Sequence, residues 1–393
     1  MANAWKIARK SNAQLPLVIV IALAVVLVLL GKAQPALFDQ ARARITDFMA
    51  PALEVARADG RVACVVPFRA DWSAAAAWVR FEGIRRGLLP PVLLDGDAAI
   101  EPVWDAECGA PYVAAARITL RAESGSVAIA EQVPVACLAE SVRDELRVLV
   151  RDGVLVDGEM VLPRVRATVD SGGARDEDGA RGPGLEPLPV ELPLRDTPLA
   201  PLLACATAWD AQLADGDVPV LLPAVILDEI AAAVRVTPGL ESGGFLLGHL
   251  HRDASASECF VEVTARIPAR HVVAERFKLT FTPETWAAAD AEAAARGRGE
   301  RIVGWDHFHP WWCGSCPAER RPGCTLDPAA FSSDDVRLHG LFGLPCATAL
   351  LSYERPDGTI AHTLHGWRRG VVVPRGYHRL DDTTRSATKE VVA

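Results

Sequence analysis

Apolar and polar residues alternate along several short stretches of this chain, and a period of two is the pattern of a half-buried β-strand. The stretches are residues 112–122, 127–138, 259–269, 276–284 and 301–310. Residues 237–253 (TPGLESGGFLLGHLHRD) begin with turn-forming residues and end in an apolar run, which predicts a loop leading into a further strand. Most of the expected strands therefore fall in the second half of the chain.

Apolar residues recur at helical spacing in three other segments, residues 141–150, 218–236 and 283–299. Pro223 and Pro283 suit a first helical turn, where the missing N–H of proline costs nothing. From residue 218 onwards the order is helix, strands, helix and strand. This mixture predicts an α/β (α+β) fold in which helices flank a sheet.

Residues 170–189 (DSGGARDEDGARGPGLEPLP) are rich in Gly, Pro and charge and have no hydrophobic period, which predicts a flexible linker. Residues 60–169 are expected to form a small α+β domain of unknown role, and residues 190–372 a larger domain. The polar residues 373–393 are typical of a frayed C-terminal tail. The chain shows no internal repeat.

An apolar run at residues 15–30 carries no charge, and it would span about 24 Å as a helix at about 1.5 Å per residue. This run predicts a single-pass transmembrane anchor, with a cleaved signal peptide and a buried helix as alternatives. Basic residues lie on both sides of the run, so the positive-inside rule does not fix the orientation.

Composition excludes one class of function and favours a reducing compartment. The net charge of −9 leaves no basic surplus for a phosphate backbone, so nucleic acid is not expected as a partner. Nine cysteines are an odd number and most are scattered, which is no disulfide framework. With half of its residues hydrophobic, most of the chain is expected to fold.

The candidate chemistry begins with IVGWDHFHPWW, residues 302–312. Because side chains alternate along a strand, Trp305, His307 and His309 share one face, and Asp306 is expected on the other as a surface charge. Pro310 cannot continue a ladder, so the two imidazoles lie at a strand end, where an open site is expected. A catalytic zinc needs three protein ligands, so a third must come from elsewhere.

The third candidate ligand is Asp335, in the segment FSSDDVRLHG. Ser332 or Ser333 is a good N-cap, so Asp335 falls in the first turn of a helix. Asp335 could complete a His, His, Asp zinc site, and the Ser332 hydroxyl could donate to a developing oxyanion. Glu241 precedes two glycines at the start of a strand and is the candidate general base.

Three motifs follow one another along the chain: E-x-x-G-x-L-x-G, which begins at Glu241, then H-x-H-P, then S-x-x-D. Over residues 218–370, these motifs and their order resemble those of the JAMM (MPN-plus) metalloproteases. The resemblance implies a curved β-sheet with helices and a zinc held by His307, His309 and Asp335. It also implies that Glu241 is the general base and that Ser332 stabilises the reaction. Members of the family cut amide bonds after ubiquitin-like or sulfur-carrier β-grasp proteins, which are then the expected partners.

The segment LLGKAQPALFDQARARITDFMAPALEVA, residues 29–56, resembles the membrane-proximal start of rod shape-determining proteins of the MreC type. That resemblance implies a single-pass inner-membrane anchor over residues 1–58, followed by a short helix. Such anchoring would send the catalytic domain to the periplasm, whereas the thiols and the expected substrates suggest the cytoplasm. The side of the membrane is therefore left open, as is a start at Met49 without the anchor.

Two features depart from the JAMM pattern. Phe308 stands where the family usually has a small hydroxyl residue, and an insertion separates His309 from Asp335. The insertion holds a cysteine cluster with zinc-like spacing, whose fourth ligand could be His339 or Cys346. A second, structural zinc on this cluster is one hypothesis, and a redox pair or unpaired thiols are the others. The cluster consists of Cys313, Cys316 and Cys324.

The sequence thus predicts a membrane-tethered zinc metallopeptidase or isopeptidase acting beside the C-terminus of a ubiquitin-like or sulfur-carrier protein. A zinc amidase or peptidase acting on another peptide conjugate is the alternative enzyme. A scaffold that keeps the fold without turnover is the alternative without catalysis.

Overall fold

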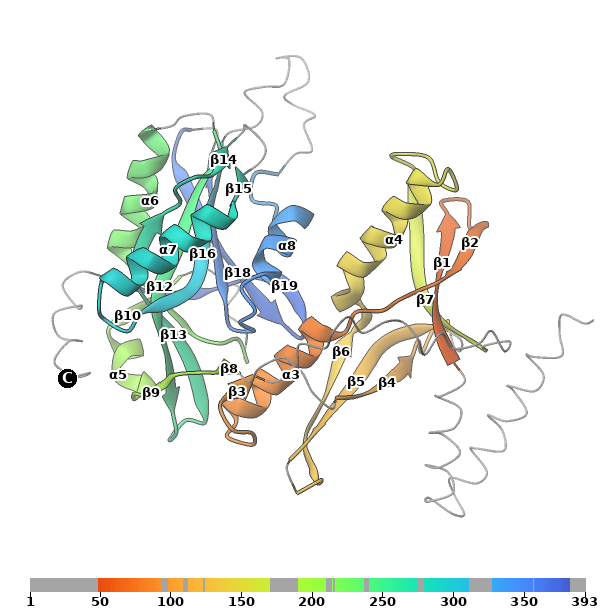
Figure 1. Ribbon diagram of the computed structural model, residues 1–393, viewed down its shortest axis with the longest axis horizontal. Helices are drawn as coiled ribbons and strands as arrows, with labels where there is room; N and C mark the ends of the chain where they lie inside the picture. The colour runs from red at the N-terminus through yellow and green to blue at the C-terminus, as the bar shows by residue number, and fades with distance from the viewer. Residues whose placement is uncertain are drawn as a thin grey trace, which may run out of the picture. The chain divides into compact units, whose positions relative to one another are not determined.

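The computed structural model describes residues 49–93, 98–108, 112–122, 124–169, 190–209, 214, 216–236, 240–274, 279–310, 327–355 and 357–381 (Figure 1). The chain forms two compact units that alternate along the sequence. The first consists of Met1–Asp71, Ile100–Arg117 and Ser141–Leu185. The second consists of Trp72–Ala99, Ile118–Glu140 and Glu186–Ala393.

The first unit is built on a three-stranded antiparallel sheet of order β2-β1-β7. Its strands are β1 (Met49–Arg57), β2 (Val62–Pro67) and β7 (Val161–Val169). Leu53 and Val55 are fully buried on one face of β1. Glu54, on the other face, accepts from Tyr112 and pairs with Arg166 at 2.7 Å. The unit also contains most of α4 (Ala139–Arg151), β4 (Ala99–Trp104) and the start of β5 (Val113–Arg121).

The second unit contains a ten-stranded curled sheet of order β10-β20-β11-β13-β12-β16-β17-β18-β19, with β9 paired to β12. Its strands are β9 (Leu194–Asp196), β10 (Ala206–Trp209), β11 (Val220–Pro223), β12 (Ser242–Asp253), β13 (Glu258–Pro268), β16 (Arg301–His309), β17 (Thr348–Glu354), β18 (Ile360–Arg368), β19 (Val371–Arg375) and β20 (Tyr377–Leu380). The strands of this unit outside the large sheet are β3 (Val92–Leu93), β6 (Val127–Pro134), β8 (Val190–Glu191), β14 (Val273–Ala274) and β15 (Leu279–Thr280).

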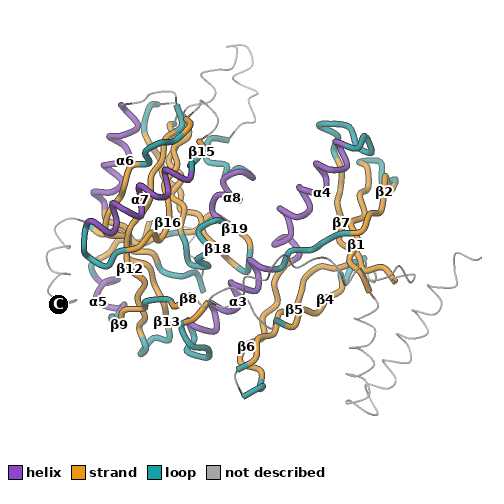
Figure 2. The backbone as a smooth tube through the Cα atoms, viewed as in Figure 1, coloured by secondary structure: helices purple, strands orange, loops and turns teal. Residues whose placement is uncertain are grey.

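The helices of the second unit are α3 (Ser73–Arg85), the 3-10 turn η2 (Val135–Leu138), α5 (Leu199–Ala204), α6 (Ala224–Val236), α7 (Pro283–Ala295) and α8 (Ser333–Gly340). Figure 2 shows α6 and α8 on opposite sides of the strands of the large sheet. Phe245 on β12 packs against Trp286 of α7 and against Phe342, just after α8, with ring centroids 5.0 and 6.3 Å away. α7 and the end of α8 therefore cover the same face of β12.

The middle of the large sheet positions the candidate site. β16 pairs antiparallel with β12 on one side and parallel with β17 on the other. Gly243 lies opposite His307, and Ser242 lies opposite Phe308. Glu241 immediately precedes β12, so this register brings it beside the end of β16.

Most expected strands and helices of the second unit are confirmed, with two corrections. Residues 220–223 are strand β11, not part of a helix, because Val220, Leu221 and Leu222 fill a fully buried position inside the sheet. The helix begins only after Pro223, at Ala224. Within 276–284, the described residues form only the two-residue strand β15 before α7.

In the first half, the expected strands near 112–122 and 127–138 are β5 and β6, and β6 ends in η2. The helix expected at 141–150 is α4, which begins two residues earlier, at Ala139. The coarse prediction of a mixed α and β fold with a curved sheet is therefore confirmed.

The expected anchor at residues 15–30 and the expected linker at 170–189 lie outside the described residues. Over the part of the chain that the structure describes, every helix is too short or too polar to cross a bilayer. Met49–Arg57 is a strand, and residues 29–48, which make up most of the segment of MreC-type resemblance, lie outside the described residues. The short helix that this resemblance implied remains a prediction. The expected frayed tail at 373–393 is corrected in its described part, because Val371–Arg375 and Tyr377–Leu380 are strands β19 and β20 of the large sheet. The other limits of the expected domains remain a prediction.

Candidate metal centre

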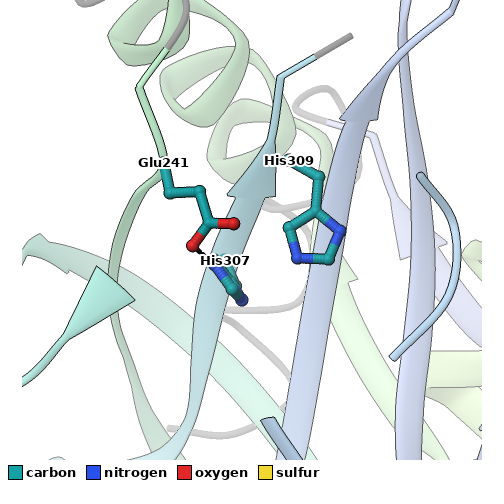
Figure 3. A group of neighbouring side chains, drawn as sticks. All are labelled: Glu241, His307 and His309. Atoms are coloured by element: carbon teal, nitrogen blue, oxygen red, sulfur yellow. Dashed lines mark hydrogen bonds and ion pairs between the residues drawn. The ribbon is translucent and has the colours of Figure 1, made fainter. Parts of the chain in front are cut away.

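Four side chains predicted from the sequence are brought together by three elements. His307 and His309 end β16, Glu241 stands just before β12, and Asp335 lies in the first turn of α8. All four are buried, although the two carboxylates belong to residue types that normally face water. Figure 3 shows Glu241 facing His307, with His309 beside them on the same side of the strand.

Glu241, His307 and His309 form a group that could hold a metal ion. One ligand atom from each residue lies within 4.8 Å of the other two. The closest approach is between His307 Nε2 and Glu241 Oε2, at 3.0 Å. The two imidazole rings are nearly perpendicular, with centroids 4.6 Å apart. The alternation of side chains along β16 therefore does bring both rings to one point.

Asp335 adds a second carboxylate to this group. Its Oδ1 lies 2.9 Å from His307 Nδ1, and its Oδ2 lies 4.0 Å from His309 Nε2. Ser332 is the N-cap of α8, and it forms a reciprocal capping box with Asp335. The Ser332 N–H donates to Asp335 Oδ2 at 2.7 Å, and the Asp335 N–H donates to Ser332 Oγ at 3.2 Å. The helix start thus holds the carboxylate that faces the histidines.

The tautomer of His309 follows from its contact with the backbone. Its Nδ1 lies 2.9 Å from the carbonyl oxygen of Pro328, which can only accept. Nδ1 therefore carries the proton, and Nε2 carries the lone pair on the side of Asp335. A backbone carbonyl in this position is the usual support of a metal-binding histidine.

The charges at the site are strongly coupled. Burial lowers the pKa of His307, but the carboxylates of Asp335 and Glu241 outweigh it and raise the pKa to about 9. Burial would raise the pKa of Asp335, but the nearby His307 lowers it to about 2. Burial and the charge of His307 lower the pKa of His309 to about 4. At neutral pH the metal-free site therefore holds one imidazolium, one neutral imidazole and the Asp335 carboxylate beside Glu241.

The residues present fit a divalent metal ion. His307 Nδ1 is buried, and among the described residues it makes no well-directed hydrogen bond, although Asp335 Oδ1 lies 2.9 Å away. Such a buried ring nitrogen costs free energy of folding unless another partner takes it up. Two imidazoles with carboxylates at hand are donors that zinc and several other divalent metals accept. The geometry supports a metal site without identifying the metal.

Ser332 is held next to Asp335 by its capping role, and it is exposed. Because its Oγ accepts from the Asp335 N–H, its own hydroxyl proton remains available as a donor to another group. The expectation that Ser332 or Ser333 caps this helix is confirmed for Ser332. The role of Ser332 in a reaction remains a prediction.

The expected second zinc site falls mostly outside the described residues, since Cys313, Cys316 and Cys324 are among those omitted. His339 is described and is fully buried on α8, where its Nδ1 accepts from Trp305 Nε1 at 3.3 Å. Cys346 is buried as a free thiol. The hypothesis of a structural zinc remains a prediction.

Asp306 corrects one expectation, because it is not a surface charge. It lies on the opposite face of β16 from the histidines and is only 1% exposed. There it forms a bidentate ion pair with Arg266 on β13. Phe308 shares that face and is buried, so the residue between the two histidines packs away from the metal site.

Sequence reasoning missed the residues behind His307. The Trp305 ring stacks on the His307 ring with centroids 5.5 Å apart and an interplanar angle of 27°. The alternation along β16 already placed both side chains on one face, and this signal was sufficient to expect a contact. Nothing in the sequence pointed to Pro328 as the partner of His309, because that contact is made by a backbone atom of a loop.

Comparisons with known proteins add little to this geometry. No family model matches the chain, and no curated protein matches it. Among solved structures, the solution structure of a protein from Desulfitobacterium hafniense matches with 17% sequence identity and a TM-score of 0.29. The match covers 42% of this chain and 94% of the other. A likeness at this level carries no argument about fold or function.

Proposed function

We propose that the chain is a zinc-dependent metallopeptidase or isopeptidase. The observation that carries this proposal is the buried group of Glu241, His307 and His309, with Asp335 Oδ1 2.9 Å from His307 Nδ1. These residues come from three separate segments, and burying so many ionisable groups together is costly unless a ligand or a reaction requires it. The proposed zinc ligands are His307, His309 and Asp335.

A zinc ion bound there would polarise a substrate carbonyl and lower the pKa of a bound water toward about 7. Glu241 is held beside His307 by the register of β12 and β16. In the proposed reaction Glu241 takes a proton from the attacking water and passes it to the leaving amine, as a general base and then a general acid. Ser332 donates a hydrogen bond from its hydroxyl group to the carbonyl oxygen on which negative charge develops.

The proposed substrate is an amide bond next to the C-terminal tail of a ubiquitin-like or sulfur-carrier protein. This part rests on the likeness of the E-x-x-G, H-x-H-P and S-x-x-D motifs to JAMM metalloproteases, and the four convergent side chains agree with that likeness. Cleavage of short peptide conjugates alone would favour the other enzyme, a zinc amidase or peptidase. Binding of a β-grasp protein without cleavage would favour a scaffold.

The decisive experiment separates the proton-transfer role of Glu241 from ligation. Glu241→Gln keeps the size of the side chain and removes its basicity, so the variant is expected to retain zinc and to lose cleavage by at least about 10²–10⁴-fold. Glu284→Gln, at an exposed glutamate in the first turn of α7, is the matched control and is expected to cleave normally. Undiminished cleavage by Glu241→Gln would remove the proposed mechanism, and loss of zinc would make Glu241 a ligand.

A single-pass inner-membrane anchor is proposed separately, from the apolar run at residues 15–30 and its basic flanks. The side on which the second unit resides is left open in this proposal. Reporter fusions at the C-terminus that are active on only one side of the membrane test both points. A full-length chain that fractionates entirely without membranes would remove the anchor.

A further inference from the structure

A buried pair of side chains lies behind His307 and takes no part in the proposed reaction. Trp305 Nε1 donates to His339 Nδ1 at 3.3 Å, and both side chains are 0% exposed. The indole N–H can only donate, so His339 Nδ1 must be the acceptor and its proton resides on Nε2. Burial lowers the pKa of His339 to about 3, which keeps its ring neutral. The orientation of the His339 ring is therefore defined by Trp305.

The same indole stacks on a proposed metal ligand. The rings of Trp305 and His307 are 5.5 Å apart and inclined by 27°. On its edges, His307 meets Glu241 at Nε2 and Asp335 at Nδ1. The carboxylates contact the edge of this ring, whereas a neighbour stacked on its face restrains the tilt of the ring. Trp305 is that neighbour.

One helix contributes to both restraints. Asp335 and His339 are four residues apart on α8, which places them on one face of the helix and one turn apart. Asp335 approaches the edge of His307, and His339 holds the indole that covers the face of His307. The position of α8 therefore affects His307 through two contacts at once.

Phe331 fixes the N-terminal end of α8 above the sheet. It stacks on His365 with ring centroids 4.4 Å apart, and it lies 5.8 Å from the Trp305 ring. Trp305, Ala349 and His365 occupy the same row on three adjacent strands. The methyl group of Ala349 is the smallest side chain of that row, between the two rings that Phe331 contacts.

His339 Nε2 is buried and has no hydrogen-bond partner among the residues that the structure describes. An unpartnered N–H in the core costs free energy of folding, and a leucine at this position would exchange it for an unpartnered Trp305 N–H. The two costs offset each other, so stability does not explain a histidine here, whereas a requirement for an acceptor facing Trp305 does.

We propose that His339 is a positioning residue of the metal centre, which sets the plane of the His307 ring by holding the Trp305 indole. This inference rests on the metal site of the proposed function but not on the proposed peptidase activity. It adds to the proposed ligands a pair of residues that never touches the ion or the substrate.

The test compares four full-length variants by zinc affinity, by the absorption spectrum of bound Co²⁺ and by the melting temperature. His339→Leu is expected to weaken zinc binding about 10-fold, as loss of a ligand's supporting contacts does. It is also expected to shift the Co²⁺ bands without lowering the melting temperature. His339→Asn places an amide oxygen close to where Nδ1 stood, so it is expected to restore affinity and spectrum.

Trp305→Phe keeps a ring against His307 but removes the indole N–H. It is expected to weaken zinc binding to a similar degree, and combining it with His339→Leu should cause no further loss, since both changes break one contact. Additive losses in the double variant would overturn the inference.

The matched control is His251→Leu, at a buried histidine of the same unit that bonds Thr197 at 2.8 Å and Glu262 at 3.0 Å. This change should lower the melting temperature and leave the Co²⁺ spectrum unaltered. If His339→Leu behaves as His251→Leu does, His339 is merely structural and the inference fails. It fails equally if His339→Leu removes a second equivalent of zinc, which would assign His339 to the cysteine cluster. Wild-type protein that takes up no zinc would instead remove the proposed function.

Discussion

Arg266 and Asp306 form a bidentate ion pair across the strand that separates them. Arg266 Nε and Nη2 each lie 2.9 Å from an oxygen of Asp306. The pair joins β13 to β16 over β12, at Gly244, where an added Cβ would lie 2.7 Å from Asp306 Oδ2. A side chain at position 244 would also lie 2.5 Å from the Ile267 carbonyl oxygen, so both neighbouring strands require glycine there. The ion pair restrains the face of β16 opposite the histidines.

Removing one partner of this pair is expected to destabilise the protein strongly. Arg266→Leu leaves the Asp306 carboxylate buried and unpaired, which costs about 3–5 kcal/mol of unfolding free energy. The exposed pair of Arg270 and Glu292 provides the control, since Arg270→Leu should cost at most about 1 kcal/mol. Urea denaturation measures both. Equal effects of the two variants would show that the bridge is unimportant.

Asp335→Asn is expected to weaken zinc binding while leaving α8 in place. The amide oxygen can still accept from the Ser332 N–H, but the charge that faces His307 is lost. Loss of a ligand should reduce affinity at least as much as the about 10–100-fold found for supporting residues. Asp334→Asn, at the exposed neighbour in the same turn, is the control. Chelator competition gives both affinities, and identical values would exclude Asp335 as a ligand.

Zinc binding is expected to release about one proton at neutral pH, because a metal ligand must be deprotonated. The proton comes from His307, whose pKa is raised to about 9, and none comes from His309, whose pKa is lowered to about 4. Apparent affinity should therefore rise tenfold per pH unit up to about pH 9. Calorimetry in buffers of different ionisation enthalpy counts the protons, and a count of zero or two would contradict this assignment.

The metal-free protein is expected to lose stability as the pH rises from about 6.5 to about 9. A folded-state pKa above the unfolded value means that the native state binds the extra proton, so the contribution of His307 is full below the unfolded pKa and disappears above about 9. His307→Gln should flatten this dependence. Denaturation midpoints measured across the range test it, and a midpoint that rises with pH would contradict it.

Ser332→Gly is expected to separate the contribution of Ser332 to helix capping from the contribution of its hydroxyl group to turnover. Glycine is tolerated at an N-cap at a cost of only a few tenths of a kcal/mol, whereas Ser332→Ala should cost about 0.5–2 kcal/mol. Both variants lack the hydroxyl and should lose about 10²–10³-fold in turnover if it serves an oxyanion. Full turnover by Ser332→Gly would restrict Ser332 to its structural role.

Strand periodicity made the core of the site predictable. The i, i+2 spacing of His307 and His309 ahead of Pro310 was enough to place both rings on one face at a strand end. The Ser332 to Asp335 spacing was enough to start a helix with the carboxylate in its first turn. These features are local, and local geometry follows directly from sequence.

Features that depend on distant neighbours were not predictable in the same way. The alternation along β16 places Asp306 on the face opposite the histidines, which was expected to face solvent. That face is buried as well, and the ion-pair partner of Asp306, Arg266, lies on another strand. Residues 220–223 have an apolar run that periodicity alone cannot assign to a strand or to a buried helix. Their place inside the sheet, between β13 and β20, decides the conformation.

The parallel pairing of β16 with β17 has a consequence for the order of folding. β12 and β13 form an antiparallel hairpin from nearby residues, but β16 meets β17 only after the intervening chain has folded back through α8. Non-local pairing closes late, because the entropy of a long loop must be lost first. Asp335 and His307 therefore meet near the end of folding. Bound zinc is expected to slow unfolding of the native protein, and zinc added during refolding is not expected to accelerate formation of the β12–β13 hairpin. The ion would then bind after the sheet has formed and stabilise it, and it would not direct the pairing of the strands.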